Sequence, residues 1–148
     1  MVTVRPSKER GGTMRGETGA EGHYFSPEKL DVFWAAVEFA SWRRAFVRRW
    51  LRGDADLRDQ ITRASRSIVL NIAEGSGELS AAEKARFYRM ARRSATECAA
   101  GLVLARHEGI APREEVAPGR ETLWRVVAML TKLTGSRKLP SPAENGER

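Results

Sequence analysis

Four stretches of this chain repeat apolar residues at intervals of three and four, which is the spacing of one face of an α-helix. Short connections separate the first three stretches. Because short connections force consecutive long helices to run antiparallel, the pattern predicts an all-α fold, an up-down antiparallel four-helix bundle. The expected inward stripes are Leu30, Phe33, Val37, Ala40, Val47 and Leu51; Leu57, Ile61, Ala64, Ile68 and Ile72; Phe87, Ala91, Ser94, Cys98 and Leu102; and Leu123, Val127, Leu130 and Leu133.

Capping residues predict where the first two helices begin and end. Ser26 followed by Pro27 fits a helix start, because serine caps the free backbone amides and proline suits the first helical position. We expect this helix to run to about Arg52. Asp54 then caps the second helix, which we expect to end at Gly75.

The third helix has clear start and end signals, whereas the start of the fourth helix is ambiguous. Ser80 opens a capping box with a glutamate three residues later, and Gly109 marks the end of the third helix. The fourth helix has two candidate starts, Pro112 and Pro118, whereas its strong apolar pattern begins at Leu123. The sequence leaves these two starts open.

The length of 148 residues suits one domain with a sizeable core. We assign the bundle to residues 26–134, and we expect polar, glycine- and proline-containing tails at residues 1–25 and 135–148 to be disordered. The first tail has no apolar segment of the kind found in secretory signals, and no apolar run is long enough to span a membrane. With a single cysteine, Cys98, the expectation is a cytoplasmic protein without an internal disulfide.

The first helix carries a second apolar stripe, which consists of Phe39, Trp42, Phe46 and Trp50. A helix in an isolated bundle needs one buried stripe, so a second one indicates another partner. We therefore predict that this stripe, extended by Val69 and Leu70, is an interface between copies of the chain in a homo-oligomer. Two alternatives stay open: the chain's own tails cover the stripe, or a different polypeptide binds it.

The positive charge is concentrated in one part of the chain. The net charge is +7, and residues 43–106 hold 14 Lys/Arg against 7 Asp/Glu. A basic surface rich in arginine favours RNA or DNA as a partner, although solvated charge or interaction with a helix dipole explains some positions as well. The candidate nucleic-acid-binding residues are Arg48, Arg49, Arg52, Arg63, Arg66, Arg86, Arg89, Arg92 and Arg93.

Residues that could carry catalysis or bind a metal are sparse. Of two histidines, neither belongs to a Glu-x-x-His motif of the di-iron bundles, and Cys98 falls on a core stripe. We expect no metal, no cofactor and no enzyme activity. We interpret Asn71, Glu74 and Gly75 as a structural turn, in which the two polar side chains bond backbone groups and the glycine adopts positive φ.

The run from Ser67 to Gly75 resembles a known family of four-helix bundles, as does its spacing to later residues. The later residues are Ser80, Glu83, Phe87, Ala91, Ser94 and Glu97. The family comprises the 23S ribosomal RNA intervening-sequence proteins and relatives of the accessory variability determinant of diversity-generating retroelements. The resemblance covers about residues 28–134.

This resemblance implies a homopentameric ring of bundles with a basic surface and no catalytic residues. In retroelements, the accessory protein associates with a reverse transcriptase and with nucleic acid, and it supports synthesis of cDNA. The expected function is therefore a non-enzymatic, oligomeric accessory protein that binds nucleic acid and a reverse transcriptase. The alternative is a bundle protein encoded in a ribosomal RNA intervening sequence and acting as a protein-binding scaffold.

Overall fold

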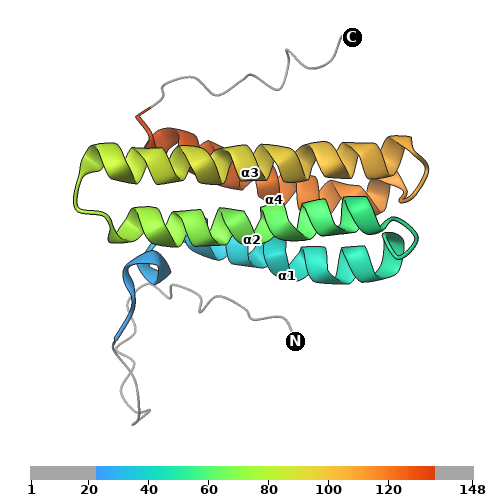
Figure 1. Cartoon of the computed structure of the whole chain (residues 1–148), viewed down its shortest axis with the longest axis horizontal. Helices are drawn as coiled ribbons and strands as arrows, with labels where there is room; N and C mark the ends of the chain where they lie inside the picture. The colour runs from blue at the N-terminus through green and yellow to red at the C-terminus, as the bar shows by residue number, and fades with distance from the viewer. Residues whose placement is uncertain (1–22, 136–148) are drawn as a thin grey trace, which may run out of the picture.

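The computed structural model describes residues 23–135, which form four long helices packed side by side (Figure 1). A short 3-10 helix, η1 (Ser26–Lys29), precedes α1 (Asp31–Trp50), α2 (Ala55–Gly77), α3 (Ala81–His107) and α4 (Arg113–Leu133). Helix α1 contacts α2 and α4, and α3 contacts the same two neighbours. The predicted all-α bundle of four helices is confirmed, and the described residues contain no strand. Most of the two predicted tails, residues 1–22 and 136–148, lies outside the described residues.

The start of the first helix differs from the prediction. Ser26 and Pro27 begin η1, which ends at Lys29. Leu30 follows in extended conformation with a ψ of 128°, and α1 starts one residue later. Glu28 makes two hydrogen bonds in this turn: its backbone carbonyl accepts one of 2.8 Å from the Trp34 indole, and its carboxylate accepts one of 2.7 Å from the backbone amide of Phe25. These bonds satisfy Glu28 within a separate turn.

Three of the predicted helix signals are confirmed. The Asp54 carboxylate accepts a bond of 3.0 Å from the backbone amide of Leu57, so it caps α2. The Ser80 hydroxyl accepts one of 3.3 Å from the amide of Glu83, at the start of α3. Gly109 has a φ of 72°, the left-handed conformation that lets the chain turn after α3.

Of the two candidate starts for the last helix, the structure uses Pro112. Pro112 is the residue before Arg113 at the start of α4, and Pro118 lies inside the helix. Directly after it, Gly119 touches the neighbouring helix: a Cβ atom there would lie 2.2 Å from the Trp42 ring. The glycine thus allows α4 to approach α1 closely.

The predicted division of α1 into an inner and an outer stripe is only partly correct, because the last two of its predicted inward residues are buried and the earlier four are partly buried. Phe39 and Phe46, expected to face outward, are buried in the core, whereas Phe33 and Val37, expected to face inward, are partly buried. The reason is the phase of the helix. Each bundle helix packs against two neighbours, so its apolar face is broad, and in α1 the face is centred on Phe39.

Trp42 and Trp50, also expected to face outward, are partly buried against the same core. The Trp42 ring stacks on Phe46 at a centroid distance of 4.8 Å. Of the two α2 residues expected to extend the outer stripe, Val69 packs against the core and Leu70 is exposed. Most of the stripe therefore packs within a single chain, and Leu70 is its exposed member.

Candidate nucleic-acid interface

The predicted basic residues do not form one continuous face. In the up-down order of the helices, Arg48, Arg49 and Arg52 lie at the end of the bundle where α1 joins α2, and Arg86 lies near the opposite end (Figure 1). Ion pairs engage some of them: Arg86 binds Glu83 at 3.0 Å, and Arg63 binds Glu97 at 3.3 Å. The exposed members of the predicted set are Arg48, Arg49, Arg52, Arg63, Arg66, Arg86, Arg89 and Arg93.

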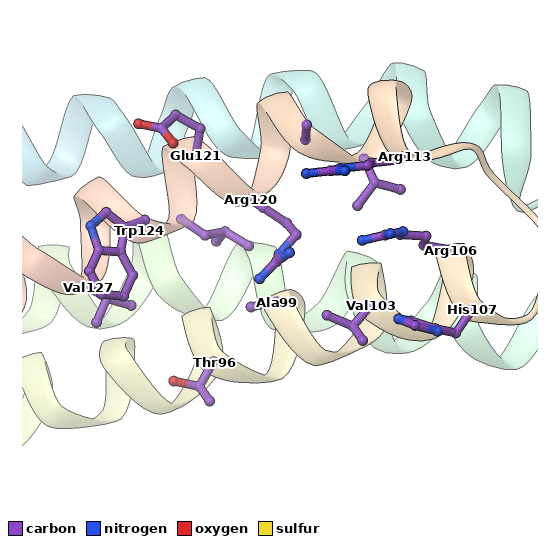
Figure 2. Close-up of a pocket in the computed structure, with 13 residues that line it drawn as sticks. Thr96, Ala99, Val103, Arg106, His107, Arg113, Arg120, Glu121, Trp124 and Val127 are labelled. Carbon is purple, nitrogen blue, oxygen red and sulfur yellow. The ribbon is translucent and has the colours of Figure 1, made fainter. Parts of the chain in front are cut away.

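A groove along the seam between α3 and α4 brings together arginines that the sequence analysis did not select. The groove has a volume of about 990 Å³ and contains Arg106 from α3 with Arg113 and Arg120 from α4. Figure 2 shows these three side chains extending into the same space between the two helices. Within residues 23–135, none of the three guanidinium groups is paired with a carboxylate.

Apolar and aromatic side chains complete the groove. Val103 and Val127 line it from opposite helices, and Trp124 stands beside Val127 (Figure 2). The Trp124 side chain is 37% exposed, whereas Leu123, the residue before it, is buried in the core. The groove therefore combines cationic hydrogen-bond donors with an accessible aromatic ring and contains a single carboxylate, that of Glu121.

One predicted residue, Arg92, lies in line with this groove. It precedes Thr96, a lining residue, by one helical turn, and its guanidinium donates a hydrogen bond of 3.4 Å to the Thr131 hydroxyl of α4. Arg89 lies three residues before Arg92, on the same side of α3. These two residues extend the basic character of the groove toward the start of α3.

The sequence contained a signal for the groove. Arg106, Arg113 and Arg120 follow one another at intervals of seven residues, and the interval from Arg113 to Arg120 corresponds to about two helical turns. The three residues meet at one seam because α4 starts at Arg113 and the chain turns back along α3 at Gly109.

A further arginine, Arg43, is buried between the helices. It is 8% exposed, its Nη1 donates a long hydrogen bond of 3.5 Å to the Thr62 hydroxyl, and its Nε has no bond. Burial, with the nearby Arg66 charge as a second cause, lowers the pKa of the Arg43 guanidinium. Its position between Phe39 and Phe46 in the helical repeat was the sign in the sequence.

Asn71, one of the predicted turn residues, lies within α2 and bonds Ser67 of the same helix. The Asn71 amide donates bonds of 2.9 Å to the Ser67 carbonyl and 3.0 Å to its hydroxyl, and that hydroxyl bonds Ser94 of α3 at 2.9 Å. Asn71 thus takes part in a polar link from α2 to α3. Glu74 is exposed on α2.

The prediction of positive φ at Gly75 is wrong. Gly75 lies within α2, and a Cβ atom there would come 2.7 Å from the Tyr88 ring of α3. The residue is glycine because the two helices touch at this point. The exposed end of α2 is closed by the Lys84 ammonium, which donates to the carbonyls of Gly75 and Ser76 at 3.3 and 3.0 Å.

Other chemical groups in the described residues give no second site. Burial raises the pKa of the Cys98 thiol to about 12, so the reactive thiolate is scarce at neutral pH. Within residues 23–135, no group of three or more His, Cys, Asp and Glu side chains is placed to hold a metal ion. None of the helices in this range has the length and apolarity to cross a lipid bilayer.

Comparison with other proteins agrees with the fold. A protein of unknown function from the S23 ribosomal protein family of Bacteroides thetaiotaomicron VPI-5482 has a similar crystal structure, with a TM-score of 0.67 and 20% sequence identity. The match covers 71% of this chain and 99% of that chain. No curated protein matches this chain in sequence. A family model described as 23S rRNA-intervening sequence protein matches residues 28–132, and the chain therefore belongs to that family.

Proposed function

We propose that this protein is a non-enzymatic, basic accessory protein that binds nucleic acid through the α3–α4 groove. The observation that carries the proposal is the convergence of Arg106, Arg113 and Arg120 in one groove without carboxylate partners in the described residues. Guanidinium groups bind phosphate oxygens through paired hydrogen bonds. Three such groups without a carboxylate partner among residues 23–135 form a site suited to a polyanion.

RNA is the first ligand to test. The family takes its description from a sequence that interrupts 23S rRNA. The whole chain also carries a net charge of +7, which attracts a phosphate backbone over a longer range than the groove alone.

A reverse transcriptase is a proposed second partner. This part of the proposal is supported by the resemblance of the run from Ser67 to Gly75 to retroelement accessory proteins, which also implies a homopentamer. A reverse transcriptase gene beside this gene, and co-purification of its product with the tagged chain, are the expected findings. A gene location inside a ribosomal RNA insertion would contradict the retroelement role.

The protein-binding scaffold is the weaker alternative. Its expected contact surface included Phe39 and Phe46, and both side chains are buried within the chain. We assign no catalytic role to Asn71 and Glu74. Asn71 is engaged with Ser67, and Glu74 lies on the exposed side of α2.

Reversing the charge of the groove tests the function. In a variant with Arg106, Arg113 and Arg120 changed to Glu, we expect affinity for labelled RNA to fall by about tenfold or more at low salt. The slope of log Kd against log salt should decrease by roughly 2 to 3, because up to three phosphate contacts are lost. Fluorescence anisotropy over a salt series measures both quantities.

A matched variant separates the groove from overall charge. Arg66, Arg86 and Arg93 are exposed outside the groove, and changing them to Glu alters the net charge by the same amount. This variant should retain most of the affinity, and circular dichroism should show both variants folded. Equal losses of RNA affinity in the two variants would show that the binding surface lies outside the groove. Absence of salt-dependent RNA binding by the wild type would contradict the proposed function.

A further inference from the structure

Trp124 has a position in the groove that packing alone does not require. It is 37% exposed, and on α4 it lies one turn after Arg120 and about one turn before Val127. Figure 2 shows its ring at one end of the groove, with the Arg113 and Arg106 side chains toward the other end. An accessible aromatic ring thus stands in line with cationic groups.

The combination matches the chemistry of a single strand. A nucleobase stacks on an aromatic side chain through its flat face, and stacking of this kind tolerates any base. In a duplex the base faces are covered by neighbouring bases, and exposing them requires unpairing. A ring within a basic groove therefore favours binding of an unpaired strand over binding of a double helix.

The spacing of the arginines is consistent with a strand that runs along the groove. Arg113 and Arg120 are seven residues apart on α4, which corresponds to about 10.5 Å along the helix axis. Arg106 extends from α3 into the same space (Figure 2). Phosphates of one strand would be held from both sides, while the base next to Arg120 would reach Trp124.

We infer that the α3–α4 groove binds single-stranded nucleic acid, with one unpaired base stacked on Trp124 and the adjacent phosphates held by Arg106, Arg113 and Arg120. This inference rests on the proposed nucleic-acid binding and adds the form of the ligand. It also assigns Trp124 a role as a stacking residue.

Substitution of Trp124 provides the test, with oligouridylate of about 12 nucleotides as the probe, a length within the usual range of single-strand sites. Trp124→Leu keeps an apolar side chain and removes the ring, and we expect it to weaken oligouridylate binding by about tenfold. Trp124→Phe keeps a ring and should retain most of the wild-type affinity. An RNA duplex of equal length should bind the wild type more weakly and should be unaffected by Trp124→Leu.

Tryptophan fluorescence provides a second, direct readout. Oligouridylate should quench part of the wild-type emission, and this part should be absent in Trp124→Phe. The remaining tryptophans, Trp34, Trp42 and Trp50, are partly buried in the bundle and serve as the internal control.

The outcomes separate this inference from the proposed function. If duplex and single strand compete equally and Trp124→Leu has no effect, the inference is overturned while nucleic-acid binding stands. If neither nucleic acid binds, both are overturned. Displacement of oligouridylate by polyglutamate at equal charge would indicate an acidic protein partner, and dissociation of an oligomer by Trp124→Leu would indicate a second copy of the chain; either result contradicts the inference.

Discussion

A buried arginine and an exposed groove arginine differ in what surrounds the charge. Arg43 lies 8% exposed, with one long hydrogen bond to Thr62 and no bond at Nε. Arg66 adds a like charge nearby, which is the second cause of its lowered pKa. A buried guanidinium with incomplete hydrogen bonding loses more hydration free energy than its hydrogen bonds in the protein return. Arg43 is therefore a cost to stability.

Replacing this charge with an apolar side chain of similar length should stabilise the bundle. For Arg43→Met we expect the free energy of unfolding to rise by roughly 1 kcal/mol, because the desolvation penalty is removed and the core contact of the side chain is kept. Urea unfolding followed by circular dichroism measures the change. Arg43→Ala is the comparison: it also removes the charge but loses the packing of the aliphatic stem, so it should be less stable than Arg43→Met. A Met variant less stable than wild type would show that the guanidinium contributes favourably.

The residues that could be predicted from sequence are those whose role depends on local bonds. Asp54 and Ser80 cap helices through amides a few residues away, and Gly109 provides a left-handed turn, so neighbouring residues in the sequence were sufficient. The role of Gly75 could not be predicted in this way, because its small size matters to Tyr88 on another helix.

At the scale of elements, the contact between α1 and α4 illustrates a requirement for close approach. Pro118 has no backbone N–H to donate within α4, and Gly119 follows it, so both residues are poor helix formers. Gly119 nevertheless lies against the Trp42 ring, where a Cβ atom would come within 2.2 Å. Packing against Trp42 therefore outweighs helix propensity at this position.

Gly119→Ala should destabilise the bundle even though alanine favours helices. We expect a loss of roughly 1 to 3 kcal/mol, because Trp42 has to move from its stacked position on Phe46. Gly77→Ala is the matched control, since Gly77 is helical and has no atom within 4 Å of its added Cβ. That control should be neutral or slightly stabilising. Thermal unfolding of both variants measures the difference, and equal stability of the Gly119 variant and the wild type would contradict the requirement for close approach.

Helix phase and helix pairing set the limit of prediction from sequence at this scale. The stripe of α1 was phased from Leu30, which lies in extended conformation before the helix, so the core position of Phe39 was missed. Arg113 and Arg120 could not be assigned to a face while the start of α4 was open between two prolines. The groove itself depends on which helices are neighbours, and that information is absent from any single helix.

At the scale of the whole molecule, the apolar residues available for self-association agree only in part with those predicted, because Leu70 is exposed whereas the aromatic side chains of the α1 stripe are buried or partly buried. Leu70 on α2 and Met90 on α3 are exposed, by 63% and 38%. The bond between Ser67 and Ser94 fixes the antiparallel register of α2 and α3, which places these two residues at a similar height along the bundle. An oligomer of this protein would use surface residues of this kind.

Light scattering should give a mass several times the 16.5 kDa of one chain, as the resemblance to a pentameric family implies. We expect Leu70→Lys combined with Met90→Lys to lower this mass, because charged side chains oppose burial in an interface. Leu133→Lys, at an exposed position at the end of α4, should leave it unchanged. A monomeric wild type would exclude a stable homo-oligomer.

The up-down order of the helices has a practical consequence for where a label or a tether is attached. With four antiparallel helices, Ser26 and Leu133 lie at one end of the bundle, and the turn carrying Gly109 lies at the other (Figure 1). Arg106 and Arg113 flank that turn. A fluorescent label or a sensor-chip tether attached at Ser26 or at Leu133 would therefore lie at the end of the bundle opposite Arg106 and Arg113.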